Sequence, residues 1–111
     1  MSAQLKFLAA TAIGFIVVGC ASAPPPPTQD MTRARTLIEQ AERAGAQRYA
    51  AVELESARDK LQQADSAQKD GKQDVANERA AEAVADAELA NARATSGTAR
   101  NAAEELQKGN E

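Results

Sequence analysis

"ERAAEAVADAELANARA", from Glu78 to Ala94, is the stretch of sequence that decides the fold. Its alanines recur at steps of three and four residues, the period that places side chains along one face of a coiled-coil helix. Alanine and glutamate are also among the strongest helix-forming residues. The stretch therefore predicts a long helix with a narrow alanine-lined face, which we call the alanine seam.

Two segments upstream show the same period with larger residues mixed in. Helices are expected over residues 30–44, 50–70 and 73–107, divided at Gly45 and Gly71 because glycine commonly follows a helix end. The expected seam residues are Met31, Ala34, Ile38, Ala41 and Gly45 with Leu37 beside them, then Ala50, Leu54, Ala57, Leu61 and Ala64, and finally Ala76, Ala80, Ala83, Ala87, Ala90 and Ala94.

These patterns predict an all-α fold. Short connections place consecutive helices antiparallel, so residues 50–70 and 73–107 are expected to form an antiparallel alanine-seamed hairpin. The helix over 30–44 would pack along this hairpin as an additional N-terminal helix. The result is an elongated, coiled-coil-like three-helix domain over 30–111. One weak point is "TSGT", Thr95 to Thr98, whose low helix propensity predicts a kink or early fraying.

The first nineteen residues have the composition of a targeting segment. Lys6 is the only charge before Cys20, and the apolar block "FLAATAIGFIVV" follows it. This block is shorter than the roughly 20 residues needed to span a bilayer. Residues 1–19 are therefore interpreted as a secretory signal peptide. The alternative is a short transmembrane anchor that stays attached.

The end of this segment resembles a bacterial lipobox. Val17, Val18 and Gly19 precede Cys20, the only cysteine in the chain. The resemblance implies cleavage before Cys20, a diacylglycerol on its sulfur and an acyl chain such as palmitate on its new amino group. A free thiol or an intermolecular disulfide are the alternatives. Residues 20–29 then form a lipidated, proline-rich linker that acts as a semi-rigid spacer.

Location follows from the same resemblance. Ala21 and Ser22 stand where an aspartate would resemble an inner-membrane retention signal. Their presence predicts an outer-membrane lipoprotein that faces the periplasm.

Composition excludes several functions. Loss of Lys6 with the signal peptide changes the net charge from −3 to −4, and the chain has no histidine or tryptophan. An acidic chain without a basic patch is not expected to bind nucleic acid. Without histidine or a free cysteine, no cofactor is expected and the protein is not expected to be an enzyme.

Four acidic residues recur every four positions: Asp74, Glu78, Glu82 and Asp86. They are either an acidic strip for a divalent cation or a basic partner, or a solvated helix face. We favour the solvated face, mostly directed outward, because the strip drifts around the helix and forms no compact oxygen cage. No metal site is predicted.

Three stretches resemble one family. They are "YAAVEL" from Tyr49, "ARDKLQQAD" from Ala57, and the opening stretch from Glu78. Together they are similar to the small alanine-rich lipoproteins grouped as domain of unknown function 4398, and the resemblance covers residues 31–94. Ala51 stands where that family often has proline. The resemblance implies a helical envelope lipoprotein and transfers no catalytic residue.

The function expected from the sequence is therefore that of a structural or protein-interaction module, anchored in the outer membrane through acylated Cys20. Its expected partners are membrane lipid, an envelope protein or a second copy of the chain. The alternative is a spacer lipoprotein that contacts peptidoglycan without a covalent bond. A metal-binding protein or an enzyme is a remote alternative.

Overall fold

The structure is a computed structural model and describes residues 27–110. The predicted signal peptide, the lipobox and Cys20 lie outside the described residues. Four helices make up the described chain: α1 (Pro27–Arg43), α2 (Ala46–Tyr49), α3 (Ala51–Lys69) and α4 (Gln73–Gly109). Residues 27–110 contain no strand. The all-α prediction is therefore confirmed.

The helix boundaries lie within three residues of the prediction, with two differences that change the description of the chain. First, α1 begins at Pro27, so the end of the predicted linker belongs to the helix. Proline suits a first turn because the N–H that it lacks would have no partner there. Second, residues Ala46–Tyr49 form a separate single turn, α2, which the sequence did not indicate.

The two predicted glycine breaks are confirmed. Gly45 and Gly71 have φ angles of 95° and 74°, which an L-residue rarely adopts. After Gly71, the Lys72 N–H donates to the Ala67 carbonyl at 2.8 Å, which satisfies one of the last carbonyls of α3. The chain can therefore reverse between α3 and α4 within three residues.

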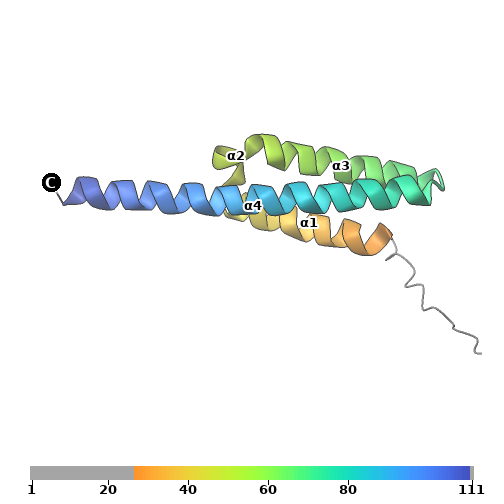
Figure 1. Ribbon diagram of the computed structural model, residues 1–111, viewed down its shortest axis with the longest axis horizontal. Coiled ribbons are helices and arrows are strands. Elements are labelled where there is room, and N and C mark those ends of the chain that lie inside the picture. The colour runs from red at the N-terminus through yellow and green to blue at the C-terminus, as the bar shows by residue number, and fades with distance from the viewer. Residues whose placement is uncertain (1–26, 111) are drawn as a thin grey trace, which may run out of the picture.

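Helix α4 is the centre of the fold (Figure 1). Both α1 and α3 pack mainly against α4 and less against each other. Helix α3 runs antiparallel to α4, and α1 lies along the hairpin, as predicted (Figure 1). The C-terminal end of α4 continues past the other helices.

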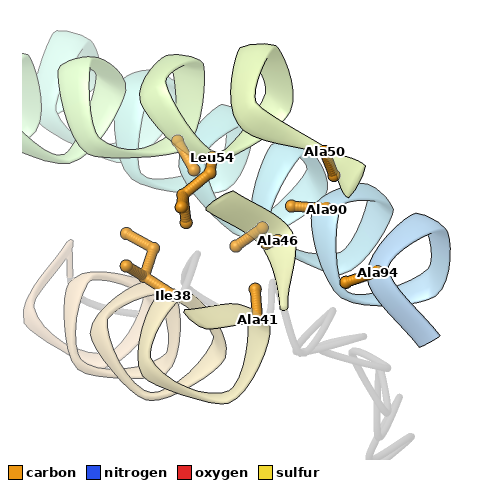
Figure 2. Close-up of a cluster of buried hydrophobic side chains, with 9 residues drawn as sticks. Ile38, Ala41, Ala46, Ala50, Leu54, Ala90 and Ala94 are labelled. Carbon is orange, nitrogen blue, oxygen red and sulfur yellow. The ribbon is translucent and has the colours of Figure 1, made fainter. Parts of the chain in front are cut away.

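The alanine seam forms the core. All predicted seam residues of α4 are fully buried, together with Ala34, Ala41 and Ala57 from the other helices. Figure 2 shows how Ile38, Leu54 and alanines from all four helices converge near the α2 turn. Gly45 and Leu61 are only half-buried. The predicted register is thus confirmed at nearly every position.

This core is thin. Met31 and Leu54 are its largest fully buried side chains, and Val52, Val75, Leu89 and Leu106 are exposed. Alanine buries little apolar area, so each seam residue contributes less to folding than a buried leucine would. Many small buried side chains along the seam, rather than a few large ones, hold the bundle together.

The prediction of a kink at Thr95–Thr98 is wrong, because α4 is continuous from Gln73 to Gly109. The Thr95 hydroxyl donates to the Asn91 carbonyl within the helix at 2.9 Å. The Thr98 hydroxyl donates to the Ala44 carbonyl at the end of α1 at 3.0 Å. Contacts with the α1–α2 turn therefore offset the low local helix propensity.

Candidate functional site

The acidic strip divides into an exposed half and a half that faces α3. Asp74 and Glu78 are exposed. Glu82 pairs with Lys60 of α3 at 2.9 Å and with Arg79 at 2.8 Å. Asp86 accepts a hydrogen bond from the Ser56 hydroxyl at 2.6 Å. The expectation of a mostly outward strip is therefore corrected, because its inner half clamps α4 to α3.

This pairing determines the electrostatics of the strip. The Lys60 ammonium, followed by the Arg79 guanidinium, holds the pKa of the Glu82 carboxyl below its ordinary value. Within residues 27–110, no group of three or more histidine, cysteine or acidic side chains could hold a metal ion. The strip has the chemistry of an inter-helix contact.

Further ion pairs join the helices. Arg33 of α1 pairs with Glu88 of α4 at 2.6 Å. Arg58 of α3 pairs with Glu42 of α1, and this hydrogen bond is the main cause of the raised pKa of Arg58. Exposed pairs of this kind each contribute about 0.2–1 kcal/mol. They connect residues far apart in the sequence, so no local pattern could have revealed them.

The α2 turn forms a shoulder on the side of α4. Tyr49 at the end of α2 lies against Gly97, and a Cβ added at Gly97 would stand 2.8 Å from the Tyr49 Cβ and closer still to its ring. The Arg48 guanidinium lies 5.2 Å from the centre of the Tyr49 ring. A depression of about 400 Å³ is lined by Tyr49, Ala92, Arg93, Ser96, Gly97 and Arg100. We call this region the Tyr49 shoulder.

A second depression continues past the Tyr49 ring. It has a volume of about 240 Å³ and reaches Asn101 and Glu104. The Tyr49 shoulder was not predicted from the sequence, although the glycine in "TSGT" could have indicated it. A glycine inside a strong helix marks a place where another group approaches the backbone closely.

The outer face of α4 lies opposite the seam, and within residues 27–110 it borders another element only at Ala92 and Ser96, beside the Tyr49 shoulder. It carries an uncharged series of exposed residues at the coiled-coil period: Ala85, Leu89, Ala92, Ser96, Ala99, Ala103 and Leu106. Leu89 is 44% exposed and Leu106 is 71% exposed. The C-terminal end of α4 projects beyond the other helices (Figure 1), and Leu106 lies three residues before the end of this helix.

Among the described helices, none is long and apolar enough to cross a membrane. The fold and the surfaces above define an elongated, alanine-seamed helical protein whose distinguishing features lie on α4. The chain belongs to the family described as domain of unknown function DUF4398, which matches residues 29–106. No curated protein and no solved structure matches the chain.

Proposed function

We propose that this protein is an outer-membrane-anchored lipoprotein whose helical domain faces the periplasm and serves as a structural or protein-interaction module. The anchoring part of the proposal rests on the order of Lys6, the apolar block and Cys20 in the sequence. Each buried methylene contributes about 0.8 kcal/mol to membrane binding, and stable attachment takes two signals such as two acyl chains. Acylation of Cys20 at both its sulfur and its amino group would meet this requirement.

The observation that carries the interaction role is the outer face of α4. Its two leucines are exposed on a helix whose last turns have no tertiary partner among residues 27–110. Most helical stability in proteins comes from tertiary packing, so packing against another chain would stabilise the projecting end. An envelope protein or a second copy of the chain would supply that packing.

A non-catalytic role is part of the proposal. The chain has no histidine and a single cysteine, which we assign to lipid. The carboxylates with lowered pKa values, Asp65 and Glu82, lie at the surface in ion pairs with basic residues. Surface ion pairs of this kind stabilise the bundle and do not create a protected site for chemistry.

Mass spectrometry of the mature N-terminal peptide tests the anchor. Cys20 should carry acyl additions, and residues 1–19 should be absent. Cys20→Ser should move the domain from the membrane fraction to the soluble periplasmic fraction. An unmodified Cys20 thiol, or a chain that still begins at Met1, would contradict the proposal.

Crosslinking and mass spectrometry on intact cells test the interaction role. Leu106→Glu should reduce crosslinks from α4, because a charge would be buried in the contact. Val52→Glu is the matched control, since Val52 is 79% exposed on α3, away from the outer face. Equal crosslinking in both variants would contradict the role. Retention on purified peptidoglycan that survives Leu106→Glu would instead favour the spacer alternative.

A further inference from the structure

The Tyr49 shoulder combines a trough, an aromatic wall and unpaired positive charge. The two depressions share Tyr49, Gly97 and Arg100, and they follow α4 from Ala92 to Glu104. At 1.5 Å per residue, this path is roughly 18 Å long. Its proportions suit an extended chain lying along the helix.

The aromatic wall is unusual for this protein. Tyr49 is its only tyrosine, and the chain has no tryptophan. The ring is half-buried against Gly97, so α4 and α2 hold it in place while part of it remains open. A fixed aromatic surface of this kind is what proline-rich and extended peptides pack against in other recognition grooves.

Positive charge at the trough is incompletely neutralised. Arg100 forms no ion pair with any residue in 27–110, and Arg48 is directed at the Tyr49 ring. Arg93 binds Glu53 of α3 but keeps 56% of its side chain exposed. Ser96 is exposed and lies between Arg93 and Arg100 in the sequence of α4. These are donors suited to a carboxylate.

The spacing of the arginines defines the ligand further. Arg93 and Arg100 are two helical turns apart, or about 10.5 Å along α4. A polyproline II chain brings residues i and i+3 to the same face at a separation of about 9.3 Å. Two acidic side chains three residues apart would therefore reach both guanidinium groups, while the residues between them contact Tyr49. Glu104 at the far end disfavours a third acid there.

We propose that the Tyr49 shoulder is a binding site for an extended acidic peptide segment of a partner protein, with acids at i and i+3 held by Arg93 and Arg100. This site deepens the interaction role proposed above and rests on it. It overlaps the outer face at Ala92 and Ser96 but includes neither Leu89 nor Leu106, so the two can fail independently.

The experiment uses the purified full chain in non-ionic detergent and synthetic six-residue peptides, which span about 19 Å as polyproline II. The probe is two repeats of Glu-Pro-Pro, and the matched neutral peptide is two repeats of Gln-Pro-Pro. Tyr49 fluorescence reports binding at the shoulder itself, because the chain has no other tyrosine and no tryptophan. The acidic peptide should change the intensity of this emission saturably, with an affinity that falls as salt is added.

Arg100→Gln should weaken binding of the acidic peptide about tenfold, as expected for loss of a charge-assisted hydrogen bond. Lys108→Gln is the matched control, because it removes the same charge from an exposed position of α4 outside the trough. It should change affinity less than about twofold, the small effect of a distant screened charge. Circular dichroism should show both variants equally helical.

Equal binding of the acidic and neutral peptides, or equal affinity of the two variants, would overturn the site. Binding of an acidic glycan such as oligogalacturonate, without binding of the peptide, would also overturn it, because the ligand class would be wrong. If the acidic peptide does not bind but crosslinks that depend on Leu106 are observed, this site is refuted and the interaction role is unaffected. If neither peptide binding nor Leu106-dependent crosslinks are observed, the interaction role itself is refuted.

Discussion

Replacing Gly97 with alanine should destabilise the protein, although alanine is the better helix former. Gly97 lies inside α4, where glycine normally costs about 1 kcal/mol relative to alanine. On helix propensity alone, Gly97→Ala would therefore raise stability. The contact with Tyr49 reverses this expectation, because the new methyl group would occupy space that the tyrosine fills.

The structure indicates how large the reversal is. The added Cβ would lie 2.8 Å from the Tyr49 Cβ, an atom that rotation of the ring cannot move. The α2 turn must therefore shift away from α4. Overpacking typically costs about 1–3 kcal/mol, and the propensity gain offsets about 1 kcal/mol of it. We expect a net loss of about 1 kcal/mol, which lowers Tm by about 4–8 °C in a domain of this size.

Thermal unfolding followed by circular dichroism measures this change. Gly109→Ala is the matched control, because Gly109 also lies in α4 but a Cβ there meets nothing within 4 Å. The control should melt at the wild-type temperature or slightly above it. A Gly97→Ala protein that melts as high as the Gly109→Ala protein would show that Tyr49 does not pack on Gly97, and the reasoning would fail.

The remaining predictions concern the seam, the α3–α4 clamp and association. Ala83→Leu should lower Tm, because it overpacks a fully buried position. Ala85→Leu, at an exposed position, should leave Tm unchanged. Equal effects of the two substitutions would refute the assignment of Ala83 to the seam. Lys60 and Arg79 lower the pKa of Glu82 in the folded protein. The stabilisation that Glu82 contributes is therefore fully present above its unfolded pKa of about 4.3. It is lost as the pH falls through the lower pKa of the folded protein. Urea unfolding between pH 7 and pH 2 should show a smaller loss of unfolding free energy in Glu82→Gln than in wild type. Identical pH profiles would show that pairing of Glu82 with Lys60 and Arg79 does not stabilise the bundle. The thin core favours self-association, which would bury more apolar surface. The unfolding midpoint should therefore rise with protein concentration, and sedimentation should report a mass above that of the monomer. A midpoint that stays constant for a monomer would count against self-association.

Local pattern was sufficient to predict most of the fold. The alanines at 80, 83 and 87 are spaced for one helix face, and that face is buried. Gly45 and Gly71 stand where the chain reverses. These features depend on residues within one or two turns of each other, where helix geometry alone determines which side chains share a face. The sequence order around Cys20 likewise carries the lipoprotein interpretation without reference to the fold.

Tertiary packing determines which contacts the residues outside the seam make. "TSGT" is unfavourable for a helix in isolation, yet Thr98 bonds to Ala44 and Gly97 accommodates Tyr49. Glu82 belongs to an acidic series in sequence, but Lys60 of another helix makes it part of a clamp. The Tyr49 shoulder exists only because α2 is placed against α4. These outcomes depend on groups up to 54 residues apart, whose proximity is set by the docking of whole helices and leaves no periodic trace in the sequence.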